Sequence, residues 1–495
     1  MAWQAPEGEN AYDIVVVGAG IAGINFGYRL QERLPNLTYT ILEGRHELGG
    51  TWSLFKYPGI RSDSDLFTFG FPWRPWHEDS SIAHGGSIHK YMKESAAEYG
   101  IDKKIQYNTM VENADYSSES NSWTLQTKVN GEKNKTFKAR WIMMCTGYYD
   151  YHNPMQVDIP GINNFKGQVI HPQFWPEDLD YANKEVVIIG SGATAVTVLP
   201  VMAEKAKHVT MLQRSPTYIL AAPTEDKLEK FIRRWFSWAP NFQDRVFRLK
   251  WILAPMLMTT FSAWFPERAK AMMLKLTKAQ LPASVPLDPH FTPSYYPWEQ
   301  RLCVCPNGDF YKSLRQGKSS VATGHIENID EKTIHLKNGQ ELSPDIIITA
   351  TGLKLKFGGG MKVSVNGKPF HIPEKFTWKG VMIEDLPNAA FVVGYVDASW
   401  TLGADATAQM MTRMITRMKK EGVVEVTPHQ SAKEKKEMKE SSLLRLNSTY
   451  VKKGMSELPK SGDRGQWTPR SYYFKDIIMA WFGDIKTGTE WVRGV

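Results

Sequence analysis

The sequence predicts an α/β fold with two Rossmann-like dinucleotide-binding domains, the first of them discontinuous, and a helical insertion. An apolar run at residues 12–17 leads into the glycine loop G-A-G-I-A-G at residues 18–23. A similar run at residues 185–189 leads into G-S-G-A-T-A at residues 190–195. The alternation of strands and helices then lapses at residues 217–310, where aromatic and basic sequence follows. Two loops of this kind on one chain indicate redox chemistry with two nucleotides.

In the first loop, Gly18 permits a tight turn, Gly20 lets the backbone approach a pyrophosphate, and Gly23 lets the helix pack closely on the strand. A second strand is predicted at residues 38–42 and ends at Glu43. A carboxylate at this place accepts hydrogen bonds from a ribose 2′-hydroxyl and would repel a 2′-phosphate. The first site is therefore predicted to bind FAD or NAD rather than NADP.

The first domain continues through a polar hairpin around residues 121–135 to an apolar strand at residues 141–145. This strand is predicted to return to the first nucleotide, where Thr146 and Gly147 follow it; an ordinary turn is the alternative. Cys145 is interpreted as a small buried residue rather than a nucleophile, since no cationic activator lies near it in the sequence.

The second loop contributes Gly190, Gly192 and Thr194, and the strand after its helix, at residues 209–212, ends differently from the first. Arg214 and Ser215 take the place of the acid. A guanidinium can bind a 2′-phosphate with two hydrogen bonds, so this site is predicted to take NADPH.

The strand pattern resumes at residues 320–321, turns at Asn338 and Gly339, and reaches a strand at residues 346–350 that ends in Thr351 and Gly352. That strand is predicted to complete the NADP domain.

A further buried strand is predicted at residues 390–394, and the segment 399–405, which contains Leu402, precedes a helix at residues 406–420. The positive end of this helix would face whatever precedes it, and in a flavin enzyme it would stabilise negative charge on the reduced flavin. The predicted division of the chain is FAD domain 1–150, linker and NADP domain 151–216, helical insertion 217–317, NADP domain 318–384, and FAD domain 385–495.

Composition is that of a folded protein with two or three domains: 495 residues, 42% hydrophobic and 23% charged. The net charge of +8 favours anionic small molecules, and phosphate-bearing cofactors account for it. No nucleic-acid-binding motif and no spacing of metal ligands is recognisable in the sequence. We therefore expect neither nucleic acid nor a metal.

Three cysteines and no C-x-x-C pair predict neither a disulfide framework nor a disulfide reductase. Residues 1–10 lack the basic and apolar regions of a signal peptide, so we expect a cytoplasmic protein.

The most apolar run, residues 251–265, falls short of the roughly 20 residues that a membrane-spanning helix needs. Two interpretations remain. We favour a buried pair of helices broken at Pro255 over a surface element, flanked by Arg248 and Lys250, that contacts a membrane or an apolar substrate.

Two longer motifs resemble those of the class B flavin monooxygenases, and among them the Baeyer-Villiger monooxygenases, over nearly the whole chain. The linker F-K-G-Q-V-I-H-P-Q-F-W-P at residues 165–176 carries the family's spacing of Phe, Gly, His and Trp-Pro. The segment G-G-T-W-S-L-F-K-Y-P-G-I-R-S-D at residues 49–63 and Y-P-W-E-Q-R-L-C-V at residues 296–304 are similar to a subgroup that activates thioamide drugs and oxidises ketones and sulfides.

This resemblance implies that FAD, NADPH and O2 act on a small apolar ketone or sulfide, and that a C4a-peroxyflavin inserts oxygen next to a ketone carbonyl to give an ester or lactone. It further implies that Arg301 is the catalytic cation, that Asp63 holds it, and that Gly50, Thr51 and Trp52 contact FAD. His171 is interpreted as a structural residue of an interdomain linker.

One departure from the family is Gln300, where many members have a Lys that helps to hold the 2′-phosphate, so Arg214 would select NADPH largely alone. The alternatives are a monooxygenase of nitrogen or sulfur atoms and a flavoprotein reductase that transfers no oxygen. The aromatic residues at 291, 295, 296 and 298 are predicted to line the substrate pocket or, alternatively, to pack in the core. The sequence leaves the oligomeric state open.

Overall fold

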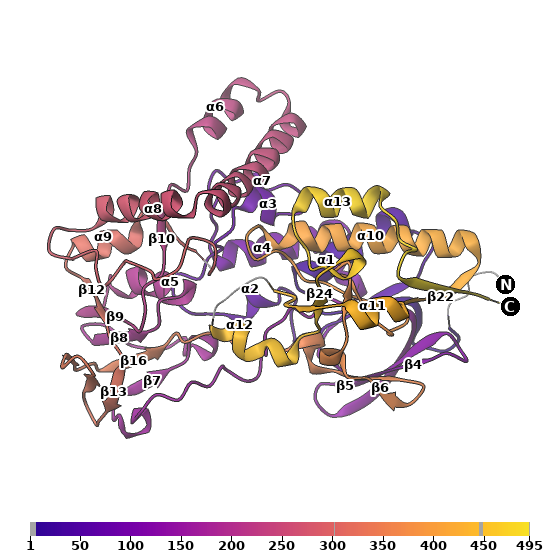
Figure 1. Ribbon diagram of the computed structural model, residues 1–495, viewed down its shortest axis with the longest axis horizontal. Helices are drawn as coiled ribbons and strands as arrows, with labels where there is room; N and C mark the ends of the chain where they lie inside the picture. The colour runs from indigo at the N-terminus through magenta and orange to yellow at the C-terminus, as the bar shows by residue number, and fades with distance from the viewer. Residues whose placement is uncertain (1–5, 301, 445–448, 495) are drawn as a thin grey trace.

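The computed structural model describes residues 6–300, 302–444 and 449–494 and is organised around two sheets (Figure 1). The first is a nine-stranded sheet in the order β18-β17-β4-β5-β6-β1-β2-β3, with β21 paired to β6. Its strands are β1 (Ala11–Val17), β2 (Tyr39–Leu42), β3 (Ile105–Gln106), β4 (Thr109–Ser117), β5 (Ser122–Val129), β6 (Lys133–Met144), β17 (Lys362–Val365), β18 (Lys368–Pro369) and β21 (Ala389–Phe391).

The centre of this sheet is parallel and buried on both faces. β1 pairs in parallel with β2 and with β6, and β21 adds in parallel to β6. The apolar run at residues 14–17 of β1 is buried throughout, which is the pattern expected of such a strand, whereas Ala11 and Tyr12 at its start are partly exposed. The polar segment predicted as a hairpin is the antiparallel pair β5 and β6.

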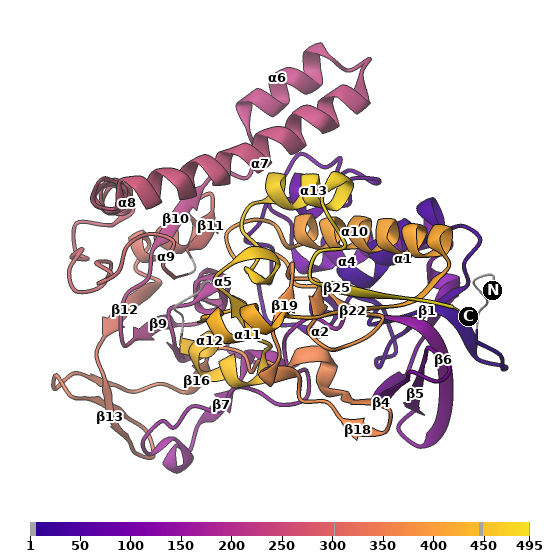
Figure 2. The ribbon, with the colours of Figure 1, turned by 45° about the vertical axis from the view of Figure 1, so that its right-hand side comes forward.

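Helices α1 (Ile21–Arg33), α4 (Gly85–Glu98), α10 (Trp400–Glu421) and α13 (Tyr473–Phe482) belong to the first domain, where α10 packs between α1 and α13 (Figures 1 and 2). Helix α10 begins at Trp400, after Ser399, and not at residue 406 as the sequence predicts. Gly403 lies inside it because a Cβ there would stand 2.9 Å from the Cα of Gly394. This close approach requires a glycine at that position of the helix.

The second sheet is parallel throughout, in the order β12-β9-β8-β16-β7. Its strands are β7 (Gln168–Ile170), β8 (Glu185–Ile189), β9 (His208–Gln213), β12 (Ser319–Thr323) and β16 (Ile346–Thr349). Helices α5 (Ala193–Met202) and α9 (Asp309–Arg315) pack on each other beside it. The turn predicted at Asn338 and Gly339 joins β14 (Ile334–Leu336) to β15 (Glu341–Leu342), beside β13 (Ile326–Ile329).

The linker motif contributes an edge strand to the second sheet, since β7 pairs with β16. Close contacts explain why residue 167 of the linker is a glycine. A Cβ on Gly167 would lie 2.4 Å from the Asp345 carbonyl oxygen and 2.5 Å from the ring of Phe165, which is itself buried.

Residues 362–369 fall within the predicted second segment of the NADP domain, but β17 pairs with β4 in the first sheet. The chain therefore crosses back to the first sheet before residue 362. A pairing between strands about 250 residues apart leaves no local trace in the sequence.

The helical insertion contains α6 (Lys227–Trp235), α7 (Pro240–Trp264) and α8 (Pro266–Gln280), flanked by the parallel strands β10 (Ile219–Ala222) and β11 (Cys303–Pro306). The favoured prediction of a buried helix pair broken at Pro255 is wrong. α7 runs through Pro255 without a break, and Leu249, Leu257 and Trp264 on it are exposed. A proline is tolerated there because the carbonyl it leaves unpaired can bond to water on an exposed helix.

None of the helices in the described ranges is both long enough and apolar enough to cross a bilayer. The remaining elements are short: α2 (Thr51–Leu54), α3 (Leu66–Phe69), α11 (Ala432–Glu437), α12 (Thr449–Gly454), β19 (Thr377–Trp378), β20 (Met382–Ile383), β22 (Val423–Pro428), β23 (Glu440–Ser441), β24 (Ser461–Gly462) and β25 (Thr489–Arg493).

Candidate active site

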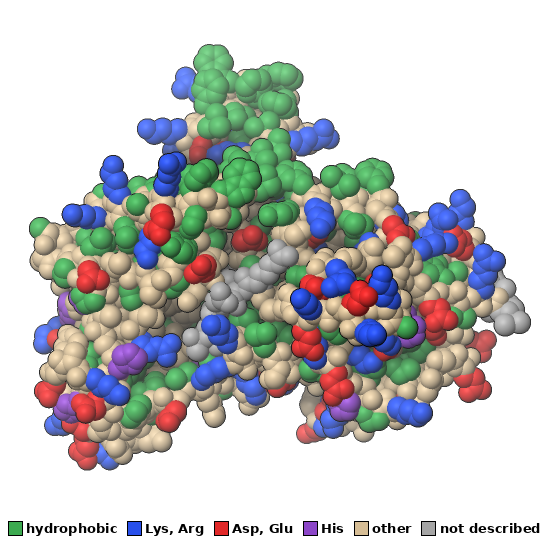
Figure 3. Space-filling view, viewed as in Figure 1, with side chains coloured by type: hydrophobic (Ala, Val, Ile, Leu, Met, Phe, Trp, Pro, Cys, Tyr) green, Lys and Arg blue, Asp and Glu red, His purple; other side chains and the backbone are tan. Residues whose placement is uncertain are grey.

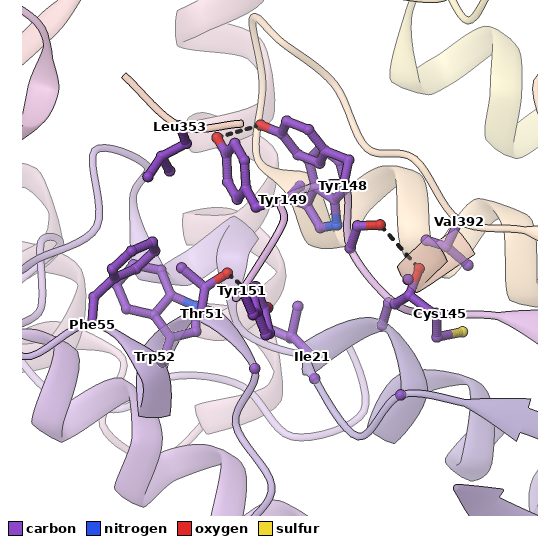
Figure 4. A pocket seen from close by; sticks show the side chains of 18 of the residues that line it. Ile21, Thr51, Trp52, Phe55, Cys145, Tyr148, Tyr149, Tyr151, Leu353 and Val392 are labelled. Carbon is purple, nitrogen blue, oxygen red and sulfur yellow. Dashed lines mark hydrogen bonds between the residues drawn. The ribbon is translucent and has the colours of Figure 1, made fainter. Parts of the chain in front are cut away.

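A cavity of about 330 Å³ lies where the carboxyl ends of the first sheet meet the second nucleotide loop (Figure 4). Its walls include most of the residues predicted to bind FAD and one predicted to bind NADP: Gly18, Gly20, Glu43, Gly50, Thr51, Trp52, Asp63, Thr146, Gly147 and Thr194. The remaining predicted residues lie outside its walls: Gly23, Leu402, Gly190, Gly192, Arg214, Ser215, Thr351 and Gly352. Arg301 lies outside the described residues.

The first glycine loop is built by close contacts that exclude a side chain. Gly18 has φ 104°, and a Cβ on it would lie 2.6 Å from the carbonyl oxygen of Cys145. A Cβ on Gly23 would lie 1.9 Å from the carbonyl oxygen of Gly18, so only glycine lets α1 start this close to the loop. Gly20 precedes the first turn of α1, whose free N–H groups form an anion site of the kind that binds a pyrophosphate.

Glu43 lies at the end of β2 and is 8% exposed. One carboxylate oxygen accepts the Ala19 N–H at 2.7 Å and the other accepts the Arg45 N–H at 2.9 Å. Burial raises the pKa of this carboxyl, and the two backbone donors oppose that shift. A carboxylate has about four acceptor positions, so the contacts fix Glu43 at the cavity wall and leave capacity for a ribose hydroxyl.

The Gly-Gly-Thr-Trp segment turns the chain into α2 at the cavity wall. Gly50 has φ 55° and Gly49 has φ 125°, and a Cβ on Gly49 would stand 2.7 Å from the His89 ring. Figure 4 shows Thr51 and Trp52 beside Tyr151, whose hydroxyl lies 3.5 Å from the Thr51 hydroxyl. The glycines thus set the direction of two side chains that line the cavity.

Asp63 faces the cavity from the loop before α3, two residues after an arginine that sequence reasoning missed. Arg61 is buried and forms a bidentate ion pair with Asp309 of α9, at 2.5 Å and 3.3 Å. This pair joins the loop that carries Asp63 to the second domain. A signal was present, since Arg61 stands in the segment 49–63 that carries the family resemblance, but its partner is 248 residues away.

The second glycine loop repeats the geometry of the first. Gly190 has φ 132°, and a Cβ on it would lie 2.3 Å from the carbonyl oxygen of Ala350. Gly192 precedes α5 and faces open space, so an anion has access to the helix N-terminus. Arg214 follows β9 with an exposed side chain, and the adjacent Ser215 carbonyl accepts the Ser191 hydroxyl at 3.1 Å.

His171 is part of the structure of the linker. Its Nδ1 accepts the Gln173 N–H at 3.2 Å and so caps a short helical turn. Burial lowers the pKa of His171, and the backbone of Gly352 opposes that shift. The ring therefore lies between the linker and the predicted Thr351-Gly352 turn, as expected of a structural residue.

Other cavity residues were not predicted, and a cluster directly after Thr146 and Gly147 is the most informative. The Asp150 side chain is buried, and Lys356 and Lys354 lie 3.5 Å and 3.6 Å from it. Burial raises the pKa of Asp150, but Asn153, two backbone N–H groups and Lys356 outweigh burial and lower it. Lys356 lines the cavity beside an ionised partner, which keeps positive charge at the wall.

Helix α10 approaches the cavity through its first residue. Trp400 lines the cavity and stacks on Tyr148 at 4.9 Å, whereas Leu402 is buried behind it. Of the aromatic residues predicted for either pocket or core, Phe291 packs in the core of the second domain. Tyr295 and Trp298 pack in a small cluster with residues of α7 and α8, and the Tyr296 hydroxyl donates to Glu267 at 2.6 Å.

Comparison with known proteins gives the family. Residues 11–454 match the family described as flavin-binding monooxygenase-like. The chain is 43% identical to the FAD-containing monooxygenase EthA of Mycolicibacterium smegmatis, over 94% of each chain. It is 41% identical to EthA of Mycobacterium tuberculosis over 96% of each, and 41% identical to the probable FAD-binding monooxygenase AlmA of Acinetobacter baylyi over 94% of this chain and 93% of that protein.

Among solved structures, the fold is similar to an oxidized steroid monooxygenase bound to NADP, with TM-score 0.75 and 20% identity over 98% of this chain and 100% of the other. It is also similar to OTEMO in complex with FAD and NADP, with TM-score 0.72 and 19% identity over 98% and 100%. Both show the predicted α/β fold. The chain belongs to the flavin-binding monooxygenase-like family, as its linker and Gly-Gly-Thr-Trp motifs predict.

Proposed function

We propose that this protein is an FAD-containing monooxygenase that uses NADPH and O2 to insert one oxygen atom next to the carbonyl of a small apolar ketone, and that it also oxidises sulfides. The observation that carries the proposal is the shared cavity. Residues of the first glycine loop, Glu43 and the Gly-Gly-Thr-Trp segment line it together with Thr194 of the second loop. Two nucleotides bound at these loops would bring their reactive ends together there.

The described residues fit an FAD. Gly20 has no side chain at the start of α1, where a Cβ would approach only the Gly50 Cα at 3.8 Å, so a pyrophosphate could reach the helix N-terminus. Glu43 is held by backbone donors at the place of a ribose. Bound FAD would supply the activation of O2. Trp400 and Tyr148 would shield the cavity from water, and Lys356 would favour negative charge at its wall.

The second site would select NADPH through Arg214. Its guanidinium is exposed at the end of β9, the place at which a parallel sheet receives a nucleotide ribose. Asp63 faces the cavity from a loop that is held by the Arg61 and Asp309 ion pair, and in the proposed reaction it positions Arg301. The relatives named EthA are described only as FAD-containing monooxygenases, which does not distinguish a ketone substrate from a sulfide. The proposal of a ketone therefore rests on the resemblance of the linker motif.

Product analysis separates the candidate reactions. The FAD-loaded protein is incubated with NADPH under ¹⁸O2 and offered a ketone and a thioether in separate reactions. An ester or lactone with one labelled oxygen supports the proposal. A labelled sulfoxide without ester identifies a heteroatom monooxygenase. NADPH consumption without labelled product identifies a reductase and overturns the proposal.

A further inference from the structure

The helical insertion exposes apolar side chains where a protein surrounded only by water would bury them. Helices α6 and α7 form a hairpin that projects from the body of the molecule (Figures 1 and 2). Figure 3 shows hydrophobic side chains gathered over this hairpin, with Lys and Arg side chains beside them. The exposed apolar residues of the insertion are Leu228, Phe231, Trp235, Trp238, Phe242, Leu249, Leu257, Trp264, Phe265 and Leu276.

The orientation of the hairpin is fixed by polar groups on its inner side. Glu229 of α6 is buried, and one carboxylate oxygen accepts the Lys250 ammonium at 3.0 Å and the Trp251 indole N–H at 2.6 Å. Asp226 caps α6 through the N–H groups of Leu228 and Glu229. Charged groups thus face inward and hold the two helices together, so the outward direction of the aromatic residues is built into the structure.

The exposed residues lie on continuous helix faces. In α6 they occur at positions 228, 231 and 235, and in α7 at 242, 249, 257 and 264, which is the spacing of one stripe along a helix. Helix α13 extends the same surface with Ile478, Trp481 and Phe482, and Tyr473 at its start lies against Arg248 of α7. Monomeric soluble proteins rarely expose so large an apolar patch unless it binds something.

Charge identifies the partner. Residues 227–280 contain eleven Lys and Arg and three Asp and Glu, a net charge of +8 that equals the net charge of the whole chain. The rest of the protein is thus formally neutral, and the positive charge is concentrated around the apolar face. A second copy of this chain would bring two strongly positive faces together, which is unfavourable. An anionic lipid surface complements both the charge and the apolar residues.

We propose that the α6–α7 hairpin, with α8 and α13, is a docking surface for a bilayer that contains anionic lipids. The exposed tryptophans are suited to the level of the lipid headgroups, the leucines and phenylalanines to the acyl boundary, and the lysines and arginines to anionic phosphates. The protein lies on the membrane and does not span it.

This surface is connected to the cavity. At the base of the hairpin, Phe247 packs on Phe67 of α3 with ring centres 5.5 Å apart, and Arg248 donates to the carbonyl oxygens of Phe67 and Gly70 at 3.0 Å and 3.1 Å. Phe69 of the same short helix lines the cavity. Docking would therefore place the cavity close to a lipid surface, the phase in which apolar substrates concentrate.

Vesicle flotation tests the proposal without reference to the reaction. The full-length, FAD-loaded protein is mixed with phosphatidylcholine vesicles with and without phosphatidylglycerol. We expect flotation with the anionic vesicles, weaker flotation with neutral vesicles, and release by salt, since roughly 1 M salt reduces the Debye length to about 3 Å. In the variant W238E/L257E, whose side chains are 79% and 63% exposed, the floated fraction should fall by about tenfold or more.

The control is Val169→Glu, which adds a charge at an exposed apolar position on the edge strand β7, outside this surface and opposite the apolar Ile347. It should float like the wild type, and the FAD content and thermal unfolding of all variants should be unchanged. The proposal is overturned if the wild type does not float, if W238E/L257E floats equally well, or if neutral and anionic vesicles bind equally. It is also overturned if the wild type stays with the soluble fraction as a dimer that W238E/L257E dissociates, which would identify a self-interface.

Discussion

Removal of the carboxylate of Asp405 tests how the C-terminal helix α10 is held on the first nucleotide domain. The Arg29 guanidinium of α1 donates to the two carboxylate oxygens of Asp405 at 2.7 Å and 3.1 Å. The two side chains are 9% and 2% exposed. Burial alone would lower the pKa of Arg29, but Asp405 and Glu32 together outweigh burial and raise it. Arginine cannot lose its charge when its partner is removed.

Asp405→Ala therefore leaves a buried cation with one remaining partner, the partly exposed Glu32. Breaking a buried ion pair in this way costs about 3–5 kcal/mol, and we expect the lower part of that range because Glu32 remains. For a unit of about 150–250 residues, each kcal/mol shifts Tm by about 2–4 °C, so Tm should fall by on the order of 10 °C. Thermal unfolding followed by the release of fluorescent FAD measures the shift.

Two further variants separate charge from packing. R29M/D405A removes both charges and should recover most of the lost stability, because a buried pair contributes little compared with apolar groups of similar size. Glu421→Ala on the same helix removes partners from the exposed side chains of Arg417 and Lys486 and should change Tm much less. Two results would refute this reasoning. One is a free energy of unfolding of Asp405→Ala within about 1 kcal/mol of the wild type. The other is an R29M/D405A variant that is no more stable than Asp405→Ala.

Three other outcomes follow from the site and its surroundings. Arg214→Ala should raise KM for NADPH by about 10- to 100-fold and leave KM for NADH nearly unchanged, since hydrogen bonds to a charged group contribute about 1.5–3 kcal/mol; equal effects on both would refute phosphate selection. Gly23→Ala places a Cβ 1.9 Å from the Gly18 carbonyl oxygen and should abolish FAD retention, which is measured by the ratio of flavin to protein absorbance. The control Gly86→Ala in α4, where a Cβ has nothing within 4 Å, should retain FAD. Burial lowers the pKa of Lys379 from 10.5 to about 8. Between these two pH values the unfolded chain binds more protons than the folded one, so the free energy of unfolding rises with pH. Lys379→Met should flatten this rise when the free energy of unfolding is measured by urea titration at several pH values, and an unchanged pH dependence would contradict a lowered pKa for Lys379.

The two nucleotide loops were predictable because their glycines stand at fixed spacings within one strand, loop and helix unit. The contact that requires Gly23 lies within its own loop, whereas Gly18 and Gly190 lie against the Cys145 and Ala350 carbonyls at the end of a neighbouring strand. Glu43 and Arg214 stand directly after the strands that position them. The centre of a parallel strand is buried on both faces, so the apolar runs at residues 14–17 of β1 and 186–189 of β8 could be predicted from residue type alone.

The exposure of the helical insertion could not be predicted from the sequence in the same way. An apolar run with a proline is equally consistent with a buried helix pair and with one long exposed helix, because sequence periodicity defines a stripe on a helix without saying what covers it. The stripe of α7 faces outward because Glu229 on α6 and Lys250 on α7 pair on the inner side. That choice depends on the packing of two helices.

The sequence by itself determined the fold class, the two cofactor loops and the family, because each is marked by motifs whose residues stand a few positions apart. Only the tertiary structure decided which distant segments meet. It pairs Arg61 with Asp309 across 248 positions and Arg29 with Asp405 across 376, returns β17 to the first sheet, and leaves the hairpin exposed. Such contacts are selected by the free energy of the whole fold, and an ion pair or an apolar face has the same local sequence whether it is buried or exposed.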